Sequence, residues 1–570
     1  MAYRWVYSEP ESVESVRELK QKLGVPDEIA RLLVLRNVRS FDDAKTFFRP
    51  ETVELHDPFL MRDMEAAADR LSAAVRGTEK VLIYGDYDVD GTTATALLYL
   101  FLKQFGADVS YYIPHRFKEG YGISSDGVQH AIDEGVDLVV SVDCGISAVE
   151  EAEVLRKNGV DLIVCDHHTV GEVLPDAVAV LDPKRPDCGY PFDGLSGAGV
   201  GFKLAQAATR KLGLPPDTVE GFLDLVAVSI ASDIVPVVGE NRMMMREGLD
   251  LINRQPRPGI RALMDACNMK PGQVSTTDIV FNIGPRINAA GRMGDASLAV
   301  ELMISQEPAG AARRAGELEQ INRKRRKTDS QTMEEAQQRL EERYDIDEIS
   351  SMVLFDPGWH LGVIGIVASR LVDRFYRPVV MLSLVDGMVK GSARSIKGFN
   401  IYDALRECDD LLVQFGGHEY AAGLTMEEEK LPEFRHRLDE IAKSSLSEND
   451  FEPELSIDAP LDLDQVDRKF WKLLSQFEPF GPGNSKPVFA SQGVEVVGVP
   501  AIVGKGHLKM QLRQNGSSVF DAIGFNMHEY MPVVRESGGG PLDVAFVIEE
   551  NFWRERRSLQ LQLRDVKKGG

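Results

Sequence analysis

"KVLIYGDYDVDGTT" (residues 80–93) places an uninterrupted apolar run directly before three aspartates at alternate positions. Similar apolar runs follow along the chain, and helical patterns separate them: "DVSYYIP" (108–114), "DLVVSVD" (137–143) and "DLIVCDH" (161–167). Continuous apolar runs separated by helices are typical of a parallel sheet that is covered on both faces. The stretch therefore predicts the first strand of a doubly wound α/β domain.

The rest of the chain predicts further domains, because 570 residues are too many for one hydrophobic core. Residues 308–344 are rich in helix formers and predict a connecting helix of roughly 55 Å. Short β-like runs near the C-terminus predict a small barrel. We expect an N-terminal segment (1–50), the doubly wound domain (51–306), the connecting helix (307–345), a second, smaller α/β domain (346–449) and the barrel (450–570).

Composition excludes several classes of protein. The net charge of -24 argues against a surface coated throughout by nucleic acid or anionic membrane, although local basic patches remain open. No apolar run is long enough to cross a membrane, and the first 20 residues lack the apolar core of a signal peptide. The five cysteines form no CxxC pair and predict neither a disulfide framework nor a zinc ribbon. We expect a cytoplasmic protein with no membrane partner.

The acidic stretch "DYDVDG" (86–91) first suggests a calcium loop. An EF-hand counted from Asp86 needs a glutamate at its twelfth position, where this chain has Leu97, and a helix where we predict a strand. These two mismatches exclude the EF-hand. Solvated turn aspartates remain the alternative for this motif taken by itself.

Two other apolar runs also end in potential metal ligands. "DLVVSVD" ends in Asp143, and "DLIVCDHHT" ends in Asp166, His167 and His168. Because the carboxyl ends of parallel strands line the ligand crevice of an open α/β sheet, we expect these side chains to converge. Clustered carboxylates with imidazole favour Mn²⁺ or Mg²⁺, and their number suggests two ions. Asp233 in "SDIVPV" is a further candidate ligand, with a simple helix-end residue as the alternative.

These residues resemble a known family. "DYDVDG", "SVDCG", "CDHH" and "SDIVPV" resemble, in order and spacing, the four motifs of the DHH phosphoesterases. "GGHEYAAG" (416–423) resembles the GGH signature of the DHHA1 domain that commonly follows. The resemblance runs from about residue 40 to 568, and with the connecting helix and barrel the layout is similar to that of the family's single-strand-specific 5′ exonucleases. It implies that the barrel is an oligonucleotide-binding (OB) fold.

The resemblance implies roles for individual residues. Asp88 and Asp143 would help to hold one metal ion, with Asp143 bridging to a second ion, whose ligands would be Asp90, Asp143, His167 and Asp233. His168 would face the scissile phosphate. Asp166 is expected to orient a histidine by a hydrogen bond.

One position departs from the family pattern. Many members have a histidine four residues before the position of Asp88, and this chain has Tyr84 there. Neutral tyrosine is a poor metal ligand. We therefore expect the first metal site to rely on Asp86 or on water.

Several cations and hydroxyls are candidates for DNA contact. Cations near predicted strand ends or glycine-rich turns are candidates by their chemistry: Arg116, Lys118, Arg286, Arg292 and Lys397. The resemblance implies that Ser392, Arg394 and His418 bind the end of the nucleic acid. The run "NRKRRK" (322–327) could follow a phosphate backbone or be a solvated helix face. Barrel candidates are Lys505, His507, Lys509, Arg513, Phe552, Trp553, Arg554, Arg556 and Arg557. Core packing is the alternative for Phe552, and simple solvation for any single arginine.

These features predict an enzyme that hydrolyses phosphodiesters with divalent metal. No Walker A sequence is present, so nucleotide hydrolysis is not expected to drive the reaction. The resemblance implies a single-stranded-DNA exonuclease that acts from the 5′ end and releases mononucleotides in DNA repair and recombination. It also implies a single-strand-binding protein and a helicase as partners. The alternatives are a phosphodiesterase for short oligonucleotides or cyclic dinucleotides, and a non-catalytic DNA-binding scaffold.

Overall fold

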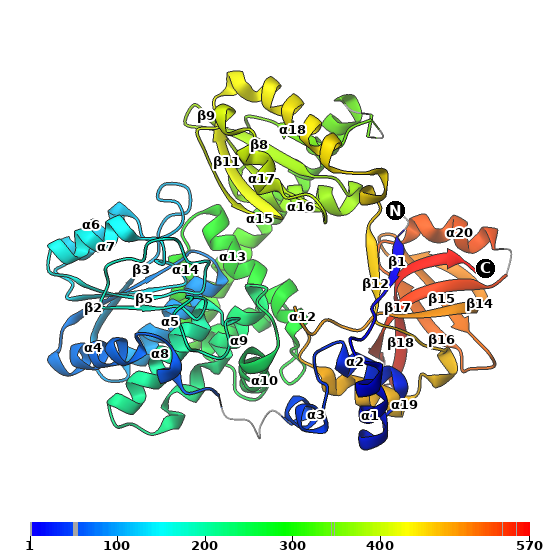
Figure 1. The fold of residues 1–570 in the computed structure, drawn as a ribbon, viewed down its shortest axis with the longest axis horizontal. Helices are drawn as coiled ribbons and strands as arrows, with labels where there is room; N and C mark the ends of the chain where they lie inside the picture. Colours follow the sequence, from blue (N-terminus) through cyan, green and yellow to red (C-terminus); the bar gives the residue numbers. More distant parts are fainter. Residues whose placement is uncertain are drawn as a thin grey trace. The chain divides into compact units, whose positions relative to one another are not determined.

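The computed structural model describes residues 3–49, 55–343, 345–346, 348–537, 540–553 and 556–569. The chain forms two compact units (Figure 1). One unit comprises Glu54–Gln331 with Pro479–Asn484. The other comprises Met1–Val53, Thr332–Glu478 and Ser485–Gly570. Among the described residues, no helix is long and apolar enough to cross a membrane.

The first of these units is built on a five-stranded parallel sheet with the order β3-β2-β4-β5-β6. Its strands are β2 (Lys80–Gly85), β3 (Asp108–Tyr112), β4 (Leu138–Val142), β5 (Asp161–Cys165) and β6 (Ala179–Leu181). When these five strands are numbered 1 to 5 in chain order, their order across the sheet is 2-1-3-4-5, which is one of the two common orders of doubly wound folds. The predicted doubly wound domain is confirmed.

Helices cover both faces of this sheet, which explains the continuous apolar runs of its strands. One face packs against α4 (Met64–Gly77), α5 (Val89–Lys103) and α8 (Gly197–Lys211), and the other packs against α6 (Ser125–Asp133) and α7 (Val149–Lys157) (Figure 1). Within one strand, Val140 and Val142 belong to the first core and Val139 to the second. Every residue of β4 is buried as a result.

A helical layer completes this unit. Its helices are α9 (Leu223–Ser232), α10 (Gly239–Arg254), α11 (Pro258–Ala266), α12 (Thr276–Asp278), α13 (Gly284–Met293) and α14 (Ser297–Met303). A π-helical segment, Ile279–Ile283, joins α12 to α13. The connecting helix α15 (Pro308–Arg343) then runs for 36 residues without interruption.

The other unit contains a mixed five-stranded sheet with the order β10-β11-β9-β8-β7. Only β7 and β8 are parallel. The strands are β7 (Met352–Phe355), β8 (Val379–Val385), β9 (Met388–Arg394), β10 (Gln414–His418) and β11 (Ala421–Met426). One face packs against α16 (Leu361–Phe375), and the other packs against α17 (Ile401–Arg406) and α18 (Leu431–Ser445). This sheet is the second α/β fold that the sequence predicts.

The C-terminal strands close into a barrel. Its strands are β14 (Phe489–Val503), β15 (His507–Arg513), β16 (Phe520–Gly524), β17 (Leu542–Trp553) and β18 (Arg556–Lys568). Pairing of β14 with both β15 and β17 closes the ring, and β13 (Ala459–Pro460) extends it. The short helices α19 (Arg468–Leu474) and α20 (Met531–Glu536) complete this part. The predicted barrel is confirmed.

The N-terminal segment packs in the same unit as the barrel. It contains α1 (Val13–Leu23), α2 (Asp27–Val34) and α3 (Phe41–Phe48), and its first strand β1 (Arg4–Tyr7) pairs in parallel with β12 (Glu454–Ile457). Arg31 donates to the carbonyl of Asp458, and Phe47 stacks edge to face with Phe477. The domain boundaries that we expect from the sequence stay a prediction.

Candidate metal centre

The potential metal ligands follow neighbouring parallel strands at one edge of the sheet. Asp86 and Asp88 come after β2, Asp143 follows β4, and His167 comes two residues after β5. The order of strands reverses between β2 and β4, because β3 lies beyond β2 on the opposite side. Such a switch point opens a crevice at the carboxyl ends of the strands, which is where ligands bind in open α/β sheets.

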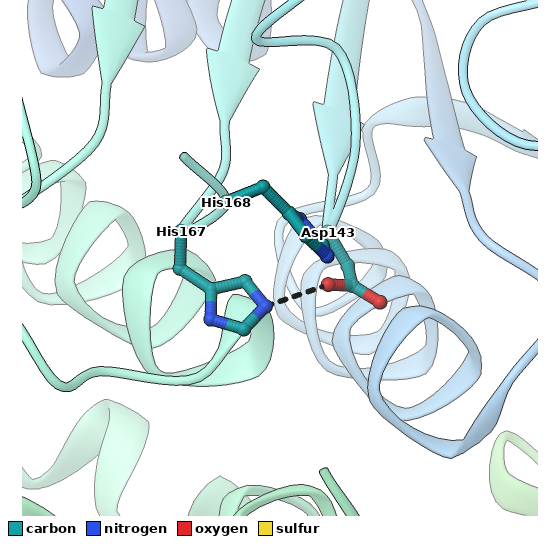
Figure 2. Close-up of side chains that lie close together, drawn as sticks. All are labelled: Asp143, His167 and His168. Atoms are coloured by element: carbon teal, nitrogen blue, oxygen red, sulfur yellow. Dashed lines mark hydrogen bonds and ion pairs between the residues drawn. The ribbon is translucent and has the colours of Figure 1, made fainter. Parts of the chain in front are cut away.

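The side chains converge around His167. Its Nε2 lies 3.0 Å from Asp143 Oδ1 and 3.6 Å from both Asp90 Oδ2 and Asp233 Oδ2. Figure 2 marks the contact with Asp143 by a dashed line. Three overlapping groups have ligand atoms within 4.8 Å of one another: Asp86 with Asp88 and Asp143, Asp90 with His167 and Asp233, and Asp143 with His167 and His168. We call Asp86, Asp88, Asp90, Asp143, His167 and Asp233 the acid cluster.

Backbone N–H groups hold two of these carboxylates in place. Asp88 caps the N-terminus of α5 by accepting from Gly91 N at 3.1 Å. Asp90, in the first turn of α5, accepts from Gly197 N at 2.6 Å and from Ala198 N at 2.8 Å. The acids therefore sit at helix N-termini, where the helix dipole favours negative charge.

Close backbone contacts fix the positions of the other acids. Asp143 has a φ of 59°, in the left-handed region that non-glycine residues rarely adopt. A Cβ on Gly197 would lie 2.6 Å from Asp143 Cβ, and one on Gly91 would lie 2.5 Å from Asp86 N. Only glycine fits at these two contacts. Strain of this kind is commonly found at functional sites.

Asp166 orients the two histidines of the DHH triplet. It is fully buried, and its Oδ1 lies 2.7 Å from His168 Nδ1 and accepts from His167 N at 2.7 Å. Its other oxygen accepts from Ile146 N at 2.9 Å. Burial opposes ionisation, but these hydrogen bonds, the one from His168 foremost, lower the pKa of Asp166 below its usual value. The expected orienting contact is thus present.

The acid cluster is electrostatically unsatisfied. Burial, and then repulsion by Asp90 and Asp88, raise the pKa of Asp143 well above its usual value. Burial, and then Asp90, raise the pKa of Asp233 to about 9.

Some polar atoms of the cluster also lack partners. Asp86 Oδ1, Asp233 Oδ2 and His167 Nδ1 are buried without a hydrogen-bond partner among the described residues. Oxygen-rich ligands with one imidazole, crowded and unneutralised, fit a centre for hard divalent cations.

Tyr84 has a different role from that of a ligand. It is buried in β2, where its hydroxyl donates to Gly122 O at 3.1 Å and accepts from Ser124 N at 3.0 Å. These bonds direct the hydroxyl toward the 114–124 loop. The hydroxyl of Tyr84 is thus already engaged within the protein, and the reliance of the first metal site on Asp86 or on water stays a prediction.

Sequence reasoning missed two residues of this region. The hydroxyl of Tyr121 lies 2.9 Å from His168 Nδ1 and donates to the carbonyl of Asp143 at 3.1 Å. Asp182 follows β6 and is fully buried, which raises its pKa to about 7. The apolar run "AVAVLDPK" (177–184) ends in an acid as the other strands do, and this signal could have revealed Asp182.

The predicted DNA-binding arginines of this unit lie in different environments. Arg116 stacks over the ring of Tyr87 at 4.8 Å and lowers the pKa of Asp86, where it opposes the larger effects of burial and Asp88. Arg292 is half-buried near the end of α13. Arg286 is only 6% exposed and is paired with Glu319 at 2.7 Å. The guanidinium of Arg286 is thus already engaged within the protein.

In the other unit, the residues predicted to bind a phosphate share one face of the mixed sheet. Arg394 on β9 is in register with Ala421 on β11, which is in register with His418 on β10. Ser392 lies two residues before Arg394 and therefore points to the same face. We call Ser392, Arg394 and His418 the GGH face.

The GGH face adjoins the beginning of α16. Arg394 Nη1 donates to Ser392 Oγ at 2.8 Å. A Cβ on Gly365 of α16 would lie 2.9 Å from Ser392 Oγ and 3.0 Å from Arg394 Nη2. The structure therefore brings the serine and the arginine together beside the early part of a helix.

Other basic candidates are placed as follows. In "NRKRRK", Arg325 is buried and bonds to Asn322, whereas Lys324, Arg326 and Lys327 are exposed. In the barrel, Lys509 and Arg513 are exposed on β15, and His507 stacks edge to face with Phe525. Arg554 and the side chains of Phe552, Trp553 and Arg556 lie outside the described residues.

Known proteins are similar to this chain in sequence over nearly its whole length. Residues 80–230 match the N-terminal domain of the DHH family, residues 348–444 the DHHA1 domain and residues 457–565 the RecJ OB domain. The single-stranded-DNA-specific exonuclease RecJ of Bacillus subtilis (strain 168) is 38% identical over 566 residues, which cover 99% of this chain and 70% of that protein. The chain belongs to the RecJ family. The RecJ of Escherichia coli (strain K12) is 33% identical over 577 residues, which cover 96% of this chain and 98% of its own.

Solved RecJ structures share the fold. The crystal structure of RecJ in complex with Mn²⁺ from Thermus thermophilus superposes with a TM-score of 0.84 at 31% identity, and the match covers 100% of this chain and 80% of that one. A Mg²⁺ complex of RecJ from the same organism gives a TM-score of 0.77 at 28% identity. Membership in the RecJ family confirms the resemblance that the four motifs and the GGH segment suggested.

Proposed function

We propose that this chain is a divalent-metal-dependent exonuclease that degrades single-stranded DNA from the 5′ end and releases 5′-mononucleotides. The observation that carries the proposal is the convergence of the acid cluster at the switch point of the parallel sheet, in a chain of the RecJ family. The related exonucleases are named as specific for single-stranded DNA.

Mn²⁺ or Mg²⁺, as two ions, is the proposed cofactor. Bound ions would lower the pKa of a water molecule and stabilise charge on the phosphate during hydrolysis. Asp88 and Asp143 would hold one ion, with help from Asp86. Asp90, Asp143, His167 and Asp233 would hold the other, which makes Asp143 the shared ligand.

His168 is proposed to contact the scissile phosphate. Its side chain is 38% exposed beside the buried acids, and its ring is fixed by Asp166. Burial alone would lower its pKa, but the hydrogen bond with Asp166 and the negative charges of Asp166 and Asp90 together raise the pKa of His168. A histidine that binds its proton more readily is suited to an anionic phosphate.

The GGH face is the proposed site for the terminal 5′ phosphate. Its serine hydroxyl, arginine guanidinium and imidazole offer donors on one face of the sheet. Arg116, Arg286 and Arg292 are further proposed DNA contacts. Because Arg286 is paired with Glu319, its contact with DNA would require exchange of that partner.

The barrel favours a polymer over a dinucleotide as substrate. A closed barrel with the RecJ OB domain pattern would bind a long strand, and a cyclic dinucleotide requires no such surface. We infer a cytoplasmic role in DNA repair and recombination, with a single-strand-binding protein and a helicase as partners.

Product analysis tests the proposal. A single strand labelled at its 5′ end should release a labelled mononucleotide at once in Mn²⁺ or Mg²⁺. The same strand labelled at its 3′ end should shorten progressively. Circular single strands and blunt duplexes should resist. Rapid cleavage of circles, or release of nucleotides from the 3′ end, would contradict the proposal.

A further inference from the structure

A lysine that no motif includes follows the last strand of the parallel sheet. Strand β6 ends at Leu181, at the same edge as the strands that deliver the acid cluster. The carbonyl of Leu181 accepts from Asp166 N at 2.9 Å, so the end of β6 is tied directly to the DHH triplet. The segment "DPK" (182–184) follows, and Lys184 is its first cation.

The backbone of Lys184 is fixed from both sides. On one side, its N–H donates to Asp182 Oδ1 at 2.7 Å, and Asp182 is fully buried. On the other side, the neighbouring Arg185 is 6% exposed and donates to Asp63 Oδ2 and to Val180 O, each at 2.6 Å. The backbone that carries this cation is therefore fixed before any ligand arrives.

The side chain of Lys184 is nevertheless free. It is exposed between the buried Pro183 and Arg185, and no carboxylate of the described residues pairs with it. Exposed lysines elsewhere in this unit often pair with a neighbour, as Lys157 does with Glu153 at 2.7 Å.

Lys184 lies on a particular flank of the acid cluster. Lys184 follows β6, an outer strand of the sheet, which pairs with β5, the strand that ends at the DHH triplet. On the opposite flank, Arg116 follows β3, the other outer strand, and stacks over the ring of Tyr87, the neighbour of Asp86. The buried acids thus have a cation at each side within one unit.

We propose that the ammonium of Lys184 binds a phosphate of the DNA strand on the β6 side of the metal centre. Lys184 is then a substrate-binding residue, and Asp182 and Arg185 position it. The inference rests on the proposed function, since it names a further contact of the same site. Its alternative is a solvated lysine that only modifies the local field.

Two kinds of measurement on one set of variants test this inference. The variants are Lys184→Met, Lys184→Arg and the control Lys157→Met, which removes an exposed lysine near the end of α7. Steady-state cleavage of a 5′-phosphorylated single strand in Mn²⁺ gives kcat and KM. Fluorescence anisotropy of a labelled strand in Ca²⁺ gives the dissociation constant, and both are measured over a series of KCl concentrations.

Lys184→Met should raise KM and the dissociation constant about tenfold, because one charged contact is lost. The slope of log affinity against log salt should fall by about 0.7, the contribution of one phosphate contact on a single strand. Lys184→Arg should restore the slope, and Lys157→Met should match the wild type.

Unchanged affinity and an unchanged salt slope in Lys184→Met would overturn the inference. A rise in Mn²⁺ affinity without a change in slope would likewise show that Lys184 acts only on the acids. Failure of the proposed function has a different signature: the wild type would bind the strand without cleaving it. The salt slope would still decide the role of Lys184 in that case.

Discussion

In the parallel sheet, the functional side chains follow the last residues of the strands, whereas in the mixed sheet Ser392 and Arg394 lie within strand β9 itself. Three acids of the first site are almost fully buried, since Asp86 is 3%, Asp90 1% and Asp143 2% exposed, whereas Asp88 and Asp233 are half-buried. On the GGH face, His418 is exposed and Arg394 is half-buried.

The difference follows from what each site has to hold. Backbone N–H groups and glycine contacts fix the acids before any cation arrives, so that like charges are kept together at an electrostatic cost. A partly exposed sheet face would suit a terminal phosphate that is bound and released in every cycle. Under the proposed function, the comparison assigns chemistry to the first site and recognition to the second.

The largest expected effect is the loss of the shared ligand. Asp143→Ala should reduce kcat by about 10⁴-fold, a loss typical of residues that act as one catalytic unit. Asp86→Ala should cost less, because Asp86 belongs to one of the three ligand groups and Asp143 to two. Rates at saturating Mn²⁺ compare the two variants. A larger loss in Asp86→Ala would reverse the assignment of the shared ligand.

The matching change on the GGH face should alter recognition and leave the metal centre intact. Arg394→Ala should reduce the preference for a 5′-phosphorylated strand over a 5′-hydroxyl strand by about 10- to 100-fold, the worth of a charged hydrogen bond. The control is Arg406→Ala, an exposed arginine on α17. Equal losses on both strands, or a change in Mn²⁺ affinity, would place Arg394 outside end recognition.

Metal removal should destabilise the protein in a pH-dependent way. Raised pKa values of Asp143 and Asp233, the latter at about 9, mean that the metal-free fold prefers their protonated forms. Their contribution to stability is complete below about pH 4, the pKa of an unfolded aspartate, and is lost as the pH rises toward about 9.

Thermal unfolding in EDTA and in Mn²⁺ tests this direction of the pH dependence of stability. The melting temperature in EDTA should fall between pH 5 and pH 9. Mn²⁺ at one fixed concentration, 100 times its Kd at pH 7, should restore about 2.7 kcal/mol at that pH, or roughly 5 °C, and the gain should be larger at higher pH. A gain that is the same at every pH would contradict the account of the acid cluster.

The smallest effect is expected at Tyr84. Tyr84→Phe removes the hydroxyl that bonds Gly122 and Ser124 and should lower the free energy of unfolding by about 1 to 3 kcal/mol. Activity should fall only a few-fold, because the 114–124 loop carries Arg116 and Tyr121 but no metal ligand. Tyr99→Phe, on α5, is the control. A loss of bound Mn²⁺ in Tyr84→Phe would make Tyr84 a ligand after all.

The sequence alone predicted the parallel sheet and the edge at which its acids gather. Continuous apolar runs indicate strands that are buried on both faces of a sheet. An acid directly after such a run must lie at the carboxyl end of its strand. The connecting helix was predicted over 307–345 and occupies Pro308–Arg343, because uninterrupted helix formers act locally.

Weak local patterns hid other parts of the site. Strand β6 has only three residues, and so short a run does not predict a strand by itself. The sequence therefore did not predict Asp182 or Lys184 as residues of the site. Tyr121 lies in the loop 114–124, where the sequence predicted a role only for the cations Arg116 and Lys118.

Only the tertiary structure decided which distant side chains meet. Sequence patterns predicted Arg286 as a DNA contact, yet the fold pairs it with Glu319, 33 positions later. Tyr84 stands where the family pattern suggests a ligand, yet its hydroxyl bonds to Ser124, 40 positions away. Hydrophobic periodicity determines which face of an element is buried and how strands are ordered into layers. The partner of a single polar group depends on the packing of elements far apart in the chain, and no local pattern records it.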